Sequence, residues 1–190
     1  MCAVKIYPLI IYLAIFVAGT ALDLWTKHAV FNALGLPGQY SADVPESESI
    51  YFLWSGVFGF QTSLNSGALF GIGQGGVKYL AIFSCIFLVG IIGFVALYAW
   101  KDYFLTVILA MISAGIAGNL YDRLALHGIQ DIDGNAVYAV RDWILVLFGS
   151  YHYPNFNIAD SFLVCSAVLL VVYSFWFDKA SAERPEENKI

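Results

Sequence analysis

Charged residues are scarce in this 190-residue chain, in which Asp, Glu, Lys and Arg make up only 12% and hydrophobic residues 60%. Soluble domains carry about 25% charged residues, so the composition excludes an ordinary soluble globular fold. Basic residues are the scarcer sign, nine Lys and Arg against fourteen Asp and Glu, and the formal net charge is −5. Because no basic patch is available to neutralise phosphates, the composition also excludes a nucleic-acid binder. A mean hydropathy of +0.74 indicates that lipid is the solvent for much of the chain.

The residues that build metal, redox and nucleotide sites are also few or wrongly spaced. Three cysteines and three histidines lie scattered, without a CxxC or an HExxH arrangement. The stretch Gly71–Gly76 matches G-x-G-x-x-G, but a membrane helix follows it and no acidic residue lies about 20 positions on. Asp131, Asp133 and Asn135 favour a plain turn over a calcium loop, because the glycine is misplaced and no Glu closes the loop. We therefore expect neither a metal nor an organic cofactor.

Four apolar segments are long enough to cross a bilayer, which takes about 20 helical residues. They cover residues ~6–31, ~77–100, ~104–120 and ~158–177, with loops over ~32–76 and ~121–157. Small residues at Gly19–Ala21 would suit a signal-peptide cleavage site, but the apolar run is long for a signal peptide and favours a retained helix. We predict a mainly α, polytopic membrane protein in which residues 1–180 form a single membrane-embedded domain and residues 181–190 a disordered cytoplasmic tail.

Positive charges indicate how the chain is oriented, because Lys and Arg are enriched in cytoplasmic loops. One membrane face holds Lys5, Lys101, Lys179, Arg184 and Lys189, and the opposite loops hold Lys27, Lys78, Arg123 and Arg141, each near a span end or a motif. By this rule both termini are cytoplasmic and the two long loops lie outside. The first of these loops ends in the aromatic and β-branched stretch Ile50–Leu64, which predicts a small β-sheet at the outer membrane interface.

Polar residues within the spans need an explanation, because they are costly in lipid. Asp23 and Lys27 lie four residues apart on one face of the first helix. As an exposed ion pair near the outer end of that helix they would stabilise it by about 0.2–0.5 kcal/mol. Alternatively, the pair faces the bundle interior and shapes a site.

The third helix ends in a group of small and polar residues. Gly115 and Gly118 permit close helix approach. Asp122 and Arg123 could be interfacial anchors at the end of the span. Asn119 is less easily explained that way, because its amide needs hydrogen-bond partners inside the bundle.

Two further carboxyl groups lie before and within the fourth span. Asp142 precedes an apolar stretch in VRDW, and Asp160 lies at the start of the fourth helix in NFNIADSF. Each also has a structural interpretation. Asp142 could be a loop carboxylate paired with Arg141, and Asp160 could be an acid in the first helical turn behind an Asn157 cap.

Five short motifs follow one another along the chain in the order of a known family. They are Asp23-x-x-x-Lys27, Asn65-Ser66-Gly67-Ala68-Leu69-Phe70-Gly71, Gly115-Ile116-Ala117-Gly118-Asn119-Leu120-Tyr121-Asp122-Arg123, Val140-Arg141-Asp142-Trp143 and Phe156-Asn157-Ile158-Ala159-Asp160. With the four spans, they make residues ~6–178 resemble the lipoprotein signal peptidase (signal peptidase II) family. The chain departs from the family pattern in having Ala114 for a further glycine, Trp143 for Phe or Tyr, and a longer stretch over 127–139.

This resemblance implies an aspartic endopeptidase of the bacterial inner membrane with Asp142 and Asp160 as its catalytic pair. It implies that the enzyme removes signal peptides from prolipoproteins, just before a cysteine that carries a diacylglyceryl group. Such a pair works with one carboxyl ionised and one protonated around a shared water, and the helix N-terminus favours Asp160 as the ionised partner. The residues implied to bind substrate or support the site are Asp23, Lys27, Asn65, Gly67, Gly115, Asn119, Asp122, Arg123 and Asn157. The expected partners are prolipoprotein substrates and membrane lipid, and we expect a monomer whose site lies near the outer membrane face.

Two other classes of protein remain as alternatives. A small transporter or channel would use Asp23, Lys27, Asp122 and Asp160 as an ion path, although the chain lacks internal repeats and has few helices. A non-catalytic membrane scaffold would bind lipoproteins or lipid. The peptidase requires the Asp142 and Asp160 carboxyls to lie close enough to share a water, whereas a transporter requires a polar path through the bundle.

Overall fold

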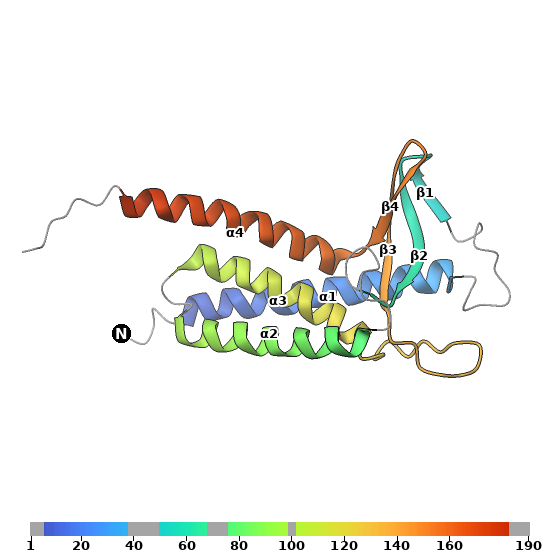
Figure 1. The fold of residues 1–190 in the computed structure, drawn as a ribbon, viewed down its shortest axis with the longest axis horizontal. Helices are drawn as coiled ribbons and strands as arrows, with labels where there is room; N and C mark the ends of the chain where they lie inside the picture. The colour runs from blue at the N-terminus through green and yellow to red at the C-terminus, as the bar shows by residue number, and fades with distance from the viewer. Residues whose placement is uncertain (1–5, 38–49, 68–75, 99–101, 183–190) are drawn as a thin grey trace, which may run out of the picture.

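The structure is a computed structural model that describes residues 6–37, 50–67, 76–98 and 102–182, the side chains of residues 98 and 176–182 excepted. Its four helices are α1 (Ile6–Leu34), α2 (Val77–Tyr98), α3 (Tyr103–Arg123) and α4 (Ile158–Ala182). Each is long and apolar enough to cross a membrane, and they lie side by side along the long axis of the molecule (Figure 1). The predicted membrane protein with four spanning helices is confirmed.

Three helices extend beyond their predicted ends. α1 continues to Leu34 and α3 to Arg123, so Asn119 and Asp122 lie in the last turns of α3 instead of at its edge. α4 continues to Ala182, two residues into the predicted tail. Lys5, Lys101, Arg184, Lys189, most of the 71–76 glycine stretch and the rest of the tail lie outside the described residues.

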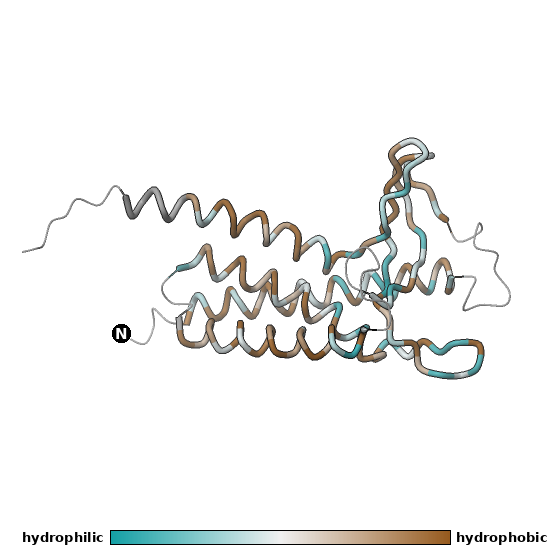
Figure 2. Tube along the Cα trace, in the orientation of Figure 1, coloured by the Kyte–Doolittle hydropathy of each residue, from teal (hydrophilic) through white to brown (hydrophobic). Residues whose placement is uncertain are grey.

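α3 is the central helix of the bundle. It contacts α1, α2 and α4. In the apolar part of α3, 50% of the residues are buried, compared with 17% in α1 and 11% each in α2 and α4. The other three helices therefore present most of their surface to lipid. Figure 2 shows apolar residues along the helices and hydrophilic residues gathered where the helices meet the sheet.

Small residues set the distances between α3 and its neighbours. A Cβ at Gly115 would lie 2.6 Å from the backbone oxygen of Ala159 in α4, and a Cβ at Gly118 would overlap the Asp23 carboxylate of α1. Gly19 of α1 faces the Cβ of Ala114. Ala114 is the residue that stands where the family pattern has a further glycine. The expectation that Gly115 and Gly118 allow close approach is confirmed, and Gly19 supplies the small partner that Ala114 requires.

A four-stranded antiparallel sheet closes one end of the bundle, in the order β1 (Ile50–Trp54), β2 (Phe58–Asn65), β3 (Val140–Phe148) and β4 (Tyr151–Phe156). The small sheet predicted from Ile50–Leu64 is confirmed, and this stretch forms β1 and most of β2. The connection over residues ~121–157 contains β3 and β4, two strands that the sequence analysis did not predict. β3 is buried over most of its length, and from Trp143 to Phe148 it is a continuous apolar run without the alternation that marks a half-exposed strand.

An aromatic cluster joins the sheet to the end of α1. Phe31, Trp143 and Ile144 are buried there, with Phe58 and Phe60 packed against them. The rings of Phe60 and Trp143 meet edge to face with centroids 5.1 Å apart. The unusual Trp143 therefore fills this cluster, and it anchors the strand that carries Asp142.

Candidate active site

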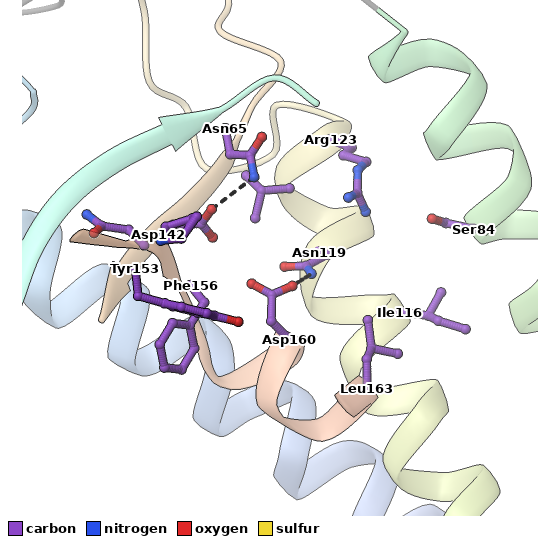
Figure 3. Close-up of a pocket in the computed structure, with 13 residues that line it drawn as sticks. Asn65, Ser84, Ile116, Asn119, Arg123, Asp142, Tyr153, Phe156, Asp160 and Leu163 are labelled. Atoms are coloured by element: carbon purple, nitrogen blue, oxygen red, sulfur yellow. Dashed lines mark hydrogen bonds between the residues drawn. The ribbon is translucent and has the colours of Figure 1, made fainter. Parts of the chain in front are cut away.

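Asp142 and Asp160 line one pocket at the junction of the sheet and the bundle (Figure 3). Asp142 is on β3 and Asp160 in the first turn of α4. The pocket has a volume of about 200 Å³, and Asn65, Asn119 and Arg123 also line it. Their side chains come from β2 and α3, so four elements converge on the two acids.

Asn157 links the two carboxylates. Its side-chain Nδ2 donates to Asp142 Oδ1 at 2.6 Å, and its backbone N–H donates to Asp160 Oδ2 at 3.2 Å. Its Oδ1 accepts from the Asp160 backbone N–H at 2.9 Å. The capping interpretation of Asp160 is therefore correct, since the two residues cap α4 reciprocally. It does not compete with a catalytic role, because the same cap places Asp160 beside Asp142.

Asn119 holds Asp160 from the opposite side, and its amide has a fixed orientation. Its Oδ1 accepts from Lys27 Nζ at 2.9 Å and from Asn157 Nδ2 at 3.1 Å. With both donors on the oxygen, the amide nitrogen must face Asp160, and Nδ2 donates to Asp160 Oδ1 at 2.8 Å. The partners that the sequence required for Asn119 are present.

Asn65 and Gly67 form a matching arrangement at Asp142. The Gly67 backbone N–H donates to Asn65 Oδ1 at 2.9 Å, which turns Asn65 Nδ2 toward Asp142 Oδ2 at 3.1 Å. The strand register explains the approach, because Ser63 lies opposite Asp142 and Asn65 is two residues along on the same face.

A buried ion network lies beneath the pocket. Lys27 Nζ contacts Asp23 Oδ2 at 2.7 Å and Asp122 Oδ2 at 3.2 Å, with all three side chains fully buried. Asp23 Oδ1 accepts from the Ala159 backbone N–H at 2.8 Å, so α1 binds the N-terminal turn of α4. Asp23 and Lys27 thus face the interior, and the interpretation as an exposed pair was wrong.

Arg141 is a component of this network that the sequence did not identify. Its Nη2 and Nε donate to Asp122 Oδ1 at 2.8 Å and 3.0 Å, and its backbone N–H donates to Asp122 Oδ2 at 3.0 Å. The alternative that paired Arg141 with Asp142 was wrong, and so was the interpretation of Asp122 as an interfacial anchor. Asp122 instead binds Arg141, the residue before Asp142, and so holds β3 against α3.

Arg123, the neighbour of Asp122, points the other way. It lines the pocket with both acids, and its buried Nε has no hydrogen-bond partner among the described residues. A cation is therefore available in the pocket for a group that develops negative charge.

The two carboxyl groups have different environments. Asp142 is buried, and this burial, together with the nearby charge of Asp160, raises its pKa to about 8. Asp160 is only partly buried, accepts a backbone N–H, and lies in the positive field of the α4 N-terminus. At neutral pH this raised pKa favours a protonated Asp142.

The interior toward the other end of the bundle is mostly apolar, with a few buried hydroxyl groups. Tyr12, Val95 and Ala110 are buried there, with Ile91 and Leu109 packed against them. Among the described residues, the buried ionisable groups of the network do not continue through this cluster, where the polar groups are the uncharged hydroxyls of Tyr12 and Ser113.

The model of the signal peptidase (SPase) II family matches residues 15–176. The lipoprotein signal peptidase of Rhodopirellula baltica is 39% identical over 174 residues, which cover 87% of this chain and 71% of that protein. The chain belongs to the signal peptidase II family. The lipoprotein signal peptidase of Bacillus pumilus is 32% identical over 70% of this chain and 79% of its own length.

Solved structures agree with the fold of this signal peptidase II family member. A bacterial membrane enzyme solved in meso at 2.3 Å resolution matches it with a TM-score of 0.69 and 23% identity, over 94% of each chain. A second, solved at 1.9 Å, gives a TM-score of 0.65 over 85% of this chain and 90% of the other. Family membership makes the chain an aspartic-type peptidase of the bacterial membrane and does not favour the transporter or scaffold alternatives.

Proposed function

We propose that Asp142 and Asp160 are the catalytic pair with which this peptidase removes the signal peptides of prolipoproteins, cutting before a diacylglyceryl-modified cysteine. One observation carries the proposal: the two carboxyls line one pocket and are joined through a single residue, Asn157. Every carboxylate oxygen of the pair already accepts one hydrogen bond from a fixed amide. Both acids are thus held in place before substrate arrives.

The proton assignment gives each acid a role. Asp160 takes a proton from the water as it attacks the scissile carbonyl carbon, and Asp142 donates its proton to the carbonyl oxygen. The proton held by Asp160 then passes to the leaving nitrogen, the C–N bond breaks, and a hydroxyl of the intermediate returns a proton to Asp142. Each such proton transfer contributes about 10²–10⁴-fold in rate.

The neighbouring polar groups support this chemistry. Arg123 adds positive charge to the pocket and would stabilise the partial negative charge that builds on the carbonyl oxygen before Asp142 protonates it. Asn65 and Asn119 hold the outer oxygens of Asp142 and Asp160, so the carboxyl planes keep their orientation as protons move. Asp23, Lys27, Asp122 and Arg141 act further out, because they hold α1, α3, α4 and β3 together.

We further propose that both termini are cytoplasmic and that the pocket lies near the outer membrane face. The positive-inside rule supports this orientation. The sheet lies at the same end of the bundle as the two acids (Figure 1), where a substrate exported through the membrane presents its cleavage site.

Cleavage of a dipalmitoylglyceryl-modified prolipoprotein by the purified protein tests the catalytic pair. Asp142→Asn and Asp160→Asn keep the size of each side chain and remove the acid, and we expect each to lower kcat by at least about 10³-fold. Asp131→Asn is the matched control, because Asp131 lies in an exposed turn away from the pocket. Near wild-type rates in folded Asp142→Asn or Asp160→Asn would refute the assignment.

A further inference from the structure

An apolar groove of about 390 Å³ lies beside the acid-lined pocket, between the sheet and α4. Phe148 of β3 forms part of its strand side, and Val164 and Cys165 form part of its helix side. These two α4 residues belong to the membrane-spanning part of the helix, Ile158–Phe175. The sheet projects sideways past α4 (Figure 1), and the groove lies between the two.

The groove is continuous with the site. Tyr153, Phe156 and Asp160 line both the groove and the acid-lined pocket. A second apolar groove, of about 330 Å³, lies between α2 and α3 around Phe87 and Phe94, and it shares no residue with that pocket. Of these two apolar grooves, only the one between the sheet and α4 is lined by a carboxylate of the pair, Asp160.

The polar groups of the two spaces differ. Beside the hydroxyl of Tyr153, which the groove shares with the pocket, its polar side chains are Asp160, at its inner end, and Ser161, whose hydroxyl already donates to the Asn157 backbone oxygen at 3.0 Å. A peptide backbone lying there would leave N–H and C=O groups unpaired, at a substantial cost. The pocket instead offers Asn65, Asn119 and Arg123 as partners for a peptide. The groove therefore suits hydrocarbon and the pocket suits backbone.

We infer that the groove under the sheet holds the acyl chains of the lipidated cysteine while the peptide on either side of the scissile bond occupies the polar pocket. The inference rests on the proposed catalytic pair, since it takes Asp160 as the point where lipid and peptide meet. Acyl chains that leave the bilayer for this groove exchange one apolar surface for another. The groove thus positions the cysteine against Asp160 and contributes little to affinity.

The first test fills the groove. Val164→Trp places a large side chain in it, and Val168→Trp is the matched control one turn along α4, equally lipid-facing and outside the groove. On a dipalmitoylglyceryl substrate we expect Val164→Trp to lower kcat/KM about tenfold or more. On a dibutyrylglyceryl substrate, whose acyl chains are much shorter, we expect a change within about twofold.

The second test locates the acyl chain directly. A substrate with a photoreactive diazirine on one acyl chain is irradiated on full-length Asp142→Asn, a residue that does not line the groove. We expect mass spectrometry to find the label on peptides that contain Phe148 or Val164 and Cys165. Labelling of α2 near Phe87 and Phe94 overturns the inference, and so does labelling spread uniformly over all lipid-facing surfaces.

The outcomes separate this inference from the proposed catalytic pair. An Asp142→Asn protein that still cuts refutes the pair, whichever residues are labelled. An inactive Asp142→Asn, together with a Val164→Trp that cuts both substrates equally well, or loses both equally, leaves the pair standing and refutes the groove. The same selective loss in Val168→Trp would also refute it, since it would mean that any bulk on this face of α4 suffices.

Discussion

The two ends of the helical bundle are built by different means from the same helices. At one end α1 contributes Tyr12 to an apolar cluster with Val95 and Ala110. At the other end α1 contributes Asp23 and Lys27 to a buried ion network. Apolar packing is non-directional, so its members tolerate replacement by side chains of similar shape. In the network each group fixes the orientation of the group that it contacts. This series of contacts ends at Asp142 and Asp160.

The largest effect that separates the two ends is expected from Lys27→Met. This change leaves the Asp23 and Asp122 carboxylates buried without the cation that contacts both, and removing one partner of a buried ion pair costs about 3–5 kcal/mol. Asn119 also loses the donor that holds its oxygen, so we expect activity to fall even where the protein stays folded. Unfolding in detergent and cleavage assays measure the two effects.

The matched control at the apolar end is Tyr12→Phe on the same helix. Tyr12 donates one buried hydrogen bond of 2.8 Å to Ser113 Oγ, and Ser113 keeps its own bond to the Leu109 backbone oxygen after the change. We expect a loss of about 0.5–1.5 kcal/mol and unchanged kcat. Equal destabilisation by the two substitutions would remove the distinction between the ends.

The same distinction explains which parts the sequence predicts. Long apolar runs identify all four helices, because only lipid accommodates them. The motifs identify the polar residues but not their partners. Arg141 bonds Asp122 only because β3 lies against the end of α3, and strand register of this kind is absent from a pattern of residue types. β4, with the sequence YHYPNF, has neither alternation nor strong β-propensity throughout, so its pairing with β3 also emerged only in three dimensions.

Helix contacts give a second, smaller contrast. Gly118→Ala places a Cβ against the Asp23 carboxylate, which must move away from Lys27 and the Ala159 N–H. We expect a loss of stability of about 1–3 kcal/mol and a lower rate. Gly90→Ala on α2 is the control, since a Cβ there meets no atom within 4 Å, and the higher helix propensity of Ala adds about 0.5–1 kcal/mol. If Gly118→Ala unfolds no more easily than Gly90→Ala, the close approach of α1 and α3 does not constrain the site.

The last contrast is in the response to pH, which only the site end should show. The pKa of Asp142 is raised from 3.8 to about 8 in the folded chain, so the folded state binds this proton more tightly than the unfolded state does. Its stabilising contribution is complete below pH 3.8, declines above it, and is lost as the pH rises through about 8. We expect the wild type to lose stability over this range relative to Asp142→Asn, which has no proton to release.

The same proton serves as the catalytic acid, so kcat should fall about tenfold per pH unit above about 8. A rate that stays level well above that pH, with the protein still folded, would show that Asp142 does not act as the acid and that the two carboxyls share their proton differently.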